Sequence, residues 1–320
     1  MGRMYGYGDI KLFAGSGSQE LAKEISEYIS VPLSGHDVLE FQNENLFVRL
    51  HGSVRGQDVY LIQSMAPPVH RNLMEMLITI DCLKRDSVGR ITAVFPYMAY
   101  ARSDKKDQPR VPITARLVAD MIEVAGTDRY MTIDLHAGQI QGFFSIPGDV
   151  LTAFHLLSDY FLQKDLENVV IATADLGFAK KGRNFAAKLG VPLAFVEKRR
   201  SGDESRARAT TVIGDVKGKD VILVDDEALT GGSMCDAARI VQEHGAKDVY
   251  LSFTHALMVT PAKDNMASIQ GLREIVTTNT VPIPQEKRLP NMTVLSVAPL
   301  LGEVIIRAHE GRSVGELFNE

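Results

Sequence analysis

Two adjacent carboxylates followed by a turn of small residues are the part of this sequence best suited to chemistry on a phosphorylated sugar. Asp225 and Asp226 directly follow the apolar run 221–224, which reads as a buried parallel strand. The turn consists of Thr230, Gly231, Gly232 and Ser233. Its N–H groups and hydroxyls can bind phosphate at the start of the helix expected next, and paired carboxylates suit vicinal sugar hydroxyls, directly or through Mg²⁺. The motif therefore predicts a ribose phosphate site, although an ordinary strand–turn–helix connection would have a similar glycine turn.

A basic loop follows a second predicted strand, 91–95. It contains Arg102, Lys105, Lys106 and Arg110, and a helix is expected to resume at Ile113. Charged loops are usually solvated surface, but a basic loop at a strand end can close over a polyphosphate and exclude water. We therefore expect this loop to bind polyphosphate.

Polar residues end three further predicted strands. His136 stands beside Asp134 at one of them, and Asp175 stands at another, which suits Mg²⁺ or phosphate. Lys198 and Arg200 follow an expected edge strand and share one side of an extended chain. These two cations could reach the same transferring phosphoryl group.

The elements that must position these residues occur twice along the chain. The strand at 58–62 parallels that at 220–224, and each is followed by a helix and another strand, 91–95 and 249–253. Strands that alternate with helices indicate βαβ crossovers and a mostly parallel sheet. The sequence therefore predicts an α/β fold with two similar domains.

We place the domains at residues 1–148 and 149–320, with the last ~20 residues packing on the N-terminal domain. Only the second copy has the acid pair and the glycine turn, since the matching place in the first reads Ser64–His70. The first copy is therefore expected to serve another task, such as binding a second substrate or forming an interface.

Composition excludes several classes of partner. Lys and Arg total 35 against 40 Asp and Glu, so the net charge of −5 offers no bulk positive field for nucleic acid. Neither a signal peptide nor a membrane-spanning apolar run is evident, and Cys82 and Cys235 suit buried thiols in a reducing compartment. We expect a cytoplasmic protein that binds neither nucleic acid nor membranes.

Several segments resemble the class I ribose-phosphate pyrophosphokinases, the phosphoribosyl diphosphate (PRPP) synthetases. The matching segments are Gly52–Tyr60, Asn72–Glu75, Tyr100–Asp107, Asp134–Phe144, Gly214–Val216, Val224–Asp226 and Ser313–Phe318. Their order and spacing carry the resemblance, which covers nearly the whole chain. It implies two tandem phosphoribosyltransferase-like domains, each with a mostly parallel sheet flanked by helices. It also implies transfer of the β,γ-diphosphoryl group of Mg-ATP to the C1 hydroxyl of ribose 5-phosphate, which gives PRPP and AMP.

The resemblance assigns roles to individual residues. The Thr230–Ser233 turn, with Leu229 before it, would bind the 5-phosphate, and Asp225 and Asp226 would bind the ribose. Lys198 and Arg200 would be the catalytic cations, and His136 and Asp175 would support Mg²⁺. ATP would contact Phe41, Asn43, Asn45, Arg102, Ser103, Asp104, Lys105 and Lys106. A regulatory phosphate would contact Ser53, Arg55, Arg110 and Ser313, and the family implies dimers assembled into a hexamer.

The sequence departs from the family pattern beside these ligands. Leu229 stands where the family usually has aspartate before the threonine, and Ser103, Asn45, Phe178 and Pro109 replace the usual glutamine, glutamate, glycine and serine. Two alternatives therefore stay open. Leu229 favours a non-catalytic regulatory paralogue. A phosphoribosyltransferase that consumes PRPP is the other, although a one-domain transferase would not need the complete first domain.

Overall fold

The computed structural model of the chain describes residues 6–164, 166–174, 176–198 and 210–315. These residues form two compact units. The first comprises the described residues up to Thr152, Thr280–Pro282 and the described residues from Ser296 on. The second comprises the described part of Ala153–Asn279 and Ile283–Leu295. The chain therefore returns to the first unit after it has built the second.

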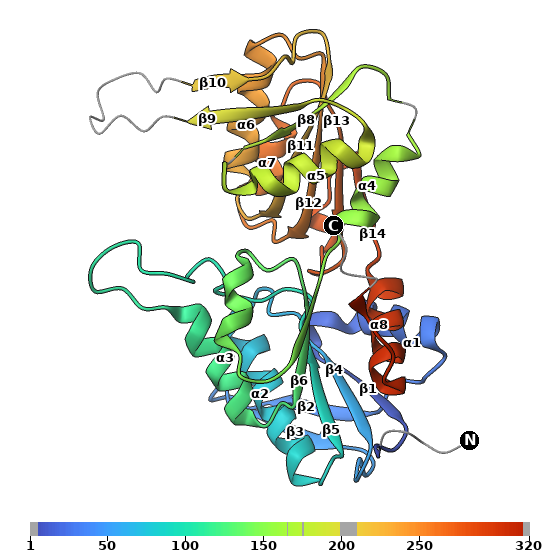
Figure 1. Cartoon of the computed structure of the whole chain (residues 1–320). Helices are drawn as coiled ribbons and strands as arrows, with labels where there is room; N and C mark the ends of the chain where they lie inside the picture. Colours follow the sequence, from blue (N-terminus) through green and yellow to red (C-terminus); the bar gives the residue numbers. More distant parts are fainter. Residues whose placement is uncertain (1–5, 165, 175, 199–209, 316–320) are drawn as a thin grey trace. The chain divides into compact units, whose positions relative to one another are not determined.

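The first unit is built on five parallel strands in the order β1-β4-β5-β6-β7 (Figure 1). The strands are β1 (Ile10–Ala14), β4 (Asp58–Ile62), β5 (Arg90–Val94), β6 (Arg129–Ile133) and β7 (Gly148–Leu151). The main helices are α1 (Gln19–Ile29), α2 (Val69–Arg85) and α3 (Thr114–Ala125), and the short helices are η1 (Ser16–Ser18) and η2 (Gly138–Phe143). Every residue of β4 is buried, as expected for a parallel strand with both faces covered.

A separate antiparallel hairpin belongs to this unit and consists of β2 (His36–Glu40) and β3 (Leu46–Leu50). The last helix, α8 (Ala298–Glu310), lies beside α1 (Figure 1). Helices from early and late in the sequence therefore pack together in the first unit.

The buried carboxylate of Asp58 ties α8 to the sheet. Asp58 is fully buried and accepts hydrogen bonds from Arg90 Nε and Nη2 at 2.7 and 2.6 Å. His309 Nδ1, on α8, lies 2.8 Å from Asp58 Oδ2. Burial of the Arg90 guanidinium opposes its charge, but its contacts with Asp58 and Tyr60 raise its pKa overall. A buried acid is tolerated here because it is fully paired.

The second unit has seven strands in its described part, in the order β10-β9-β8-β11-β12-β13-β14 (Figure 1). They are β8 (Val169–Thr173), β9 (Leu193–Lys198), β10 (Thr210–Ile213), β11 (Asp220–Ala228), β12 (Asp248–Ala256), β13 (Leu272–Thr278) and β14 (Met292–Leu295). The helices are α4 (Phe154–Leu162), α5 (Ala179–Leu189), α6 (Gly232–Glu243) and α7 (Ala262–Ala267), with η3 (Leu176–Phe178) and η4 (Gln285–Lys287).

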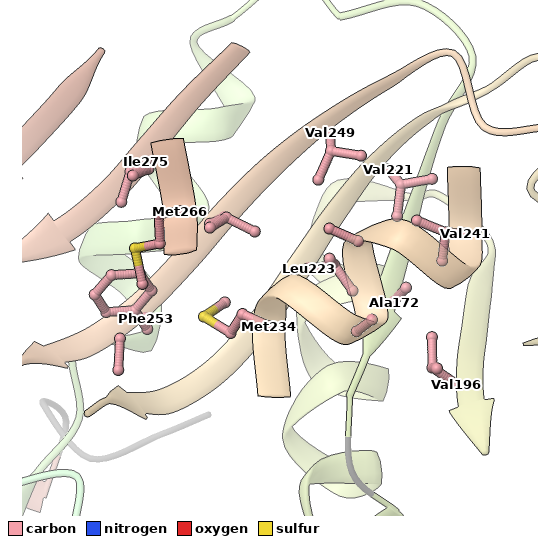
Figure 2. Packing of buried hydrophobic residues seen from close by; sticks show 14 of the residues in the cluster. Ala172, Val196, Val221, Leu223, Met234, Val241, Val249, Phe253, Met266 and Ile275 are labelled. Carbon is pink, nitrogen blue, oxygen red and sulfur yellow. The ribbon is translucent and has the colours of Figure 1, made fainter. Parts of the chain in front are cut away.

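The core of this unit lies between its helices and the sheet. Figure 2 shows Met234 and Val241 of α6 together with Leu223 of β11, Phe253 of β12 and Met266 of α7. All five side chains are almost completely buried. This packing fixes α6 and α7 on the sheet and so fixes the turn with which α6 begins.

The two units share one topology, which confirms the predicted fold class. The order β1-β4-β5-β6-β7 matches β8-β11-β12-β13-β14, and each unit has an antiparallel hairpin after its first strand and helix. The prediction that β9 is an edge strand is wrong, because β10 pairs with it antiparallel, with Thr210 opposite Lys198. In the described ranges, no helix is both long enough and apolar enough to span a bilayer.

Candidate functional site

The acid pair lies inside β11 rather than after it, which corrects the predicted strand end. β8 pairs with β11 only as far as Thr173 opposite Val224, whereas β12 continues to pair up to Ala228. The strand outlasts the apolar run because β12 supplies a partner for these extra residues. Asp225 and Asp226 therefore lie where β11 extends beyond β8, on the side of a parallel sheet where ligands bind.

Successive backbone N–H groups orient the acids. Asp226 N–H donates to Asp225 Oδ1, and Glu227 N–H donates to Asp226 Oδ1, both at 2.9 Å. Asp226 and Glu227 are 7% and 8% exposed, and Asp225 is half-buried. A carboxylate held in this way can accept hydrogen bonds from sugar hydroxyls or bind Mg²⁺.

The turn before α6 depends on glycine for its backbone conformation. Gly231 precedes α6 with φ of +70°, which is the left-handed region that favours glycine. A Cβ there would lie 3.1 Å from Met266 Cε. Thr230 and Ser233 are exposed, and Leu229 is 38% exposed. Within the described residues, no side chain caps α6 and no acid lies in its first turn, so the helix N-terminus is suited to an anion.

Residues 258–265, which the sequence analysis did not identify, form hydrogen bonds with the backbone of this turn. Met258 N–H donates to Ala228 O at 3.1 Å, and Val259 N–H donates to Leu229 O at 2.9 Å. Asn265 Nδ2, on α7, donates to Thr230 O at 2.8 Å. Nothing in the local sequence marks these contacts, because they join positions far apart in the chain.

The basic loop of the first unit is anchored at two points. Ser103 Oγ accepts a hydrogen bond from Thr114 N–H at 3.3 Å at the start of α3. Asp104 is 7% exposed and accepts a hydrogen bond from Gln139 Nε2. The loop's basic residues are exposed: Arg102, Lys105, Lys106 and Arg110. Ser103 and Asp104 thus hold the loop while its cations face solvent.

The other residues predicted to contact ATP lie in the turn between β2 and β3. Phe41 N–H donates to Asn45 O at 2.9 Å, and Asn45 N–H lies 3.3 Å from Asn43 Oδ1. The Phe41 side chain is 53% exposed. An exposed aromatic ring on a hydrogen-bonded turn offers a flat surface to a nucleobase.

The residues predicted to support Mg²⁺ are only partly described. His136 is exposed after β6, whereas its neighbour Asp134 is buried and accepts a hydrogen bond from Thr152 Oγ1 at 2.9 Å. Asp175 and Arg200 lie outside the described residues, as does the side chain of Lys198. No three His, Cys, Asp or Glu side chains of the described residues form a metal site. Mg²⁺ commonly needs only one or two carboxylates together with substrate phosphates and water, and the Asp225 and Asp226 oxygens fit that preference.

The residues predicted to bind a regulatory phosphate all belong to the first unit. Ser53 Oγ lies 3.3 Å from Arg55 N, and Ser313 Oγ lies 3.2 Å from Gly315 N. Arg55 and Arg110 are exposed. Their role in binding a shared phosphate stays a prediction.

In the first unit, Gln63 after β4 and Glu75 on α2 bind the loop that follows β1. Gln63 Oε1 accepts the Gly17 N–H at 2.9 Å, and Gln63 Nε2 donates to Asn72 O at 3.0 Å. Glu75, which is 1% exposed, accepts the Ser16 N–H at 2.7 Å. In the first unit, the side chain that follows β4 thus binds the protein's own backbone in the loop after β1.

Comparison with known proteins places these features in a family. The model of the N-terminal domain of ribose phosphate pyrophosphokinase matches residues 10–126, and the phosphoribosyl synthetase-associated domain matches residues 203–319. The chain is 45% identical to a ribose-phosphate pyrophosphokinase from Caldanaerobacter subterraneus subsp. tengcongensis, over 97% of this chain and 98% of that protein. It is 46% identical to a ribose-phosphate pyrophosphokinase from Campylobacter jejuni, over 98% of this chain and 100% of that protein. A crystal structure of phosphoribosylpyrophosphate synthetase from Mycobacterium smegmatis is similar to it with a TM-score of 0.90 and 43% identity, covering 95% of this chain and 100% of that one.

Proposed function

We propose that this chain, which belongs to the ribose-phosphate pyrophosphokinase family, transfers the β,γ-diphosphoryl group of Mg-ATP to the C1 hydroxyl of ribose 5-phosphate. The products are PRPP and AMP. One structural observation carries the proposal: β11 presents two oriented carboxylates and leads directly into a left-handed glycine turn at the start of α6. Carboxylates and an anion-binding helix start are what a sugar phosphate needs from a protein.

Ribose 5-phosphate would bind to the second unit. The turn Thr230–Ser233 would hold the 5-phosphate through N–H groups and hydroxyls, and Asp225 and Asp226 would accept hydrogen bonds from the ribose. The Leu229 side chain is apolar, so it contributes no hydrogen bond to the sugar. The half-burial of Asp225 leaves part of its side chain accessible to a ligand.

ATP would bind to residues of the first unit. The exposed ring of Phe41 would stack on the base, with Asn43 and Asn45 in the same turn. Arg102, Lys105 and Lys106 would contact the phosphates from a loop that Ser103 and Asp104 anchor. Local basic groups must bind the phosphates, because the chain as a whole has a net negative charge.

Catalysis would depend on position and fixed positive charge. Diphosphoryl transfer moves charge onto oxygen atoms and requires little covalent work from a side chain. Lys198 and Arg200 would stabilise that charge, and His136 and Asp175 would support the metal. When bound, Mg²⁺ neutralises phosphate charge and orients the transferring group. We also propose a cytoplasmic homo-oligomer of dimers assembled into a hexamer.

The test is a product assay. Purified protein is supplied with Mg-ATP and ribose 5-phosphate, and AMP and PRPP are quantified together. We expect both products in equal amounts, and neither when ribose 5-phosphate is replaced by ribose. Formation of ADP instead of AMP would contradict the proposal, because it would mean transfer of a single phosphoryl group.

A further inference from the structure

α7 contacts the turn Thr230–Ser233, although α6 and β12 separate the two in sequence. Asn265 Nδ2 donates to Thr230 O at 2.8 Å, across 35 residues of sequence. The same helix places Met266 Cε and Cγ 3.1 and 3.3 Å from where a Gly231 Cβ would be. Asn265 thus holds the carbonyl of Thr230, and Met266 packs beside the α-carbon of Gly231.

The hydrogen bond from Asn265 sets the direction of one peptide plane. A trans peptide unit is planar, and its carbonyl oxygen and amide hydrogen point in opposite directions. Because Thr230 O points to α7, the N–H of Gly231 must point away from α7. Among the described residues, none accepts a hydrogen bond from that N–H.

Asn265 is itself held in place. Its own N–H donates to Pro261 O at 3.0 Å, and its carbonyl accepts Ser268 Oγ at 2.6 Å. The neighbouring Met266 is fully buried in the core of the second unit (Figure 2). A half-buried amide on a helix anchored in this way can keep the peptide plane of the turn fixed before a ligand arrives.

We infer that Asn265 is a positioning residue for the phosphate group of ribose 5-phosphate. It acts through Thr230 and Gly231 and does not touch the ligand. The inference rests on the proposed function, because it needs that turn to bind the 5-phosphate. The hydrogen bonds of Asn265 to Thr230, Pro261 and Ser268 all lie within the second unit, whereas the residues proposed to bind ATP belong to the first unit.

Three substitutions on α7 test the inference. Asn265→Ala removes the donor, and Asn265→Asp keeps the shape but turns the donor into an acceptor facing Thr230 O. Asp264→Ala is the matched control, because Asp264 is an exposed neighbour with no side-chain hydrogen bond among the described residues. Binding of ribose 5-phosphate is measured by calorimetry, and KM for each substrate, kcat and the thermal midpoint are measured on the same samples.

We expect Asn265→Ala to weaken ribose 5-phosphate binding and raise its KM by about 3- to 10-fold, as for a lost neutral hydrogen bond. Asn265→Asp should weaken binding at least as much. KM for ATP should stay within about 2-fold, and the thermal midpoint should match that of Asp264→Ala.

Two outcomes would overturn the inference. One is ribose 5-phosphate affinity in both Asn265 variants within about 2-fold of wild type. The other is an equal loss for both substrates accompanied by a lower thermal midpoint, which would mean a purely structural role. If the wild-type protein failed to bind ribose 5-phosphate at all, the proposed function would fail with it. Normal wild-type binding and turnover with unchanged variants would refute only the role of Asn265.

Discussion

Replacing Gly231 by alanine should destabilise the second unit, whereas the same change at its neighbour Gly232 should not. Gly231 has φ of +70°, and a left-handed conformation costs a residue with a Cβ about 1–2 kcal/mol. The new Cβ would also lie 3.1 Å from Cε of the buried Met266, which must then shift within a packed core. Overpacking of this kind adds about 1 kcal/mol. The total expected loss is about 2–3 kcal/mol.

Gly232 provides the matched control because the substitution is chemically identical and one residue away. A Cβ at Gly232 would meet only Thr230 Oγ1, at an ordinary 3.5 Å, and this residue opens α6 with no positive φ. Alanine is also a better helix former than glycine, so Gly232→Ala should be neutral or stabilise the unit by up to about 1 kcal/mol.

Urea unfolding followed by far-ultraviolet circular dichroism measures the stability of both variants. Circular dichroism is used because the chain has no tryptophan whose fluorescence could report unfolding. The midpoint for Gly231→Ala should lie about 1 M below that for Gly232→Ala. Equal midpoints would refute the reasoning, because they would mean that neither the backbone conformation nor the contact with Met266 constrains this position.

Three further predictions concern other parts of the chain. Lys198→Ala should lower kcat by about 100- to 1,000-fold with a smaller change in both KM values, as measured by steady-state kinetics; a fall confined to substrate affinity would contradict a catalytic role. Burial alone would raise the pKa of Glu274, but hydrogen bonds led by that from Lys164 lower it overall, so its charged form stabilises the fold. Glu274→Gln should therefore cost about 1–2 kcal/mol near pH 7, and this difference from wild type should fade as the pH falls below the ordinary glutamate range and through the lowered pKa of Glu274, which urea titrations at neutral and at acidic pH can check. Asp58→Asn should leave the Arg90 charge buried without its partner and cost about 3 kcal/mol in urea unfolding; a loss below about 1 kcal/mol would show that the pair does not hold α8 on the sheet.

The sequence was sufficient to predict the repeated α/β organisation. That organisation depends on local patterns, namely apolar runs that suit buried strands and the helices expected between them. The end of β11 was mispredicted because its last residues pair with β12, and the length of β12 cannot be read from 221–228. β9 was mistaken for an edge strand because its partner β10 is only four residues long.

The support of the phosphate turn could not be predicted for a related reason. The contact between Asn265 and Thr230 depends on how α7 packs against α6, which is a property of the assembled core. Likewise, the hydrogen bonds of Ser16 and Gly17 join the loop after β1 to Glu75 on α2 and to Gln63 after β4. Pattern reasoning finds the residues that face a ligand more readily than those that hold them in position.

The most direct test of the account is a crystal structure of the protein with ribose 5-phosphate. We expect the 5-phosphate to contact the turn Thr230–Ser233, with its oxygens toward the N–H of Gly231, and the ribose hydroxyls to contact Asp225 or Asp226. A sugar phosphate bound elsewhere, with this turn empty, would contradict the assignment of the site.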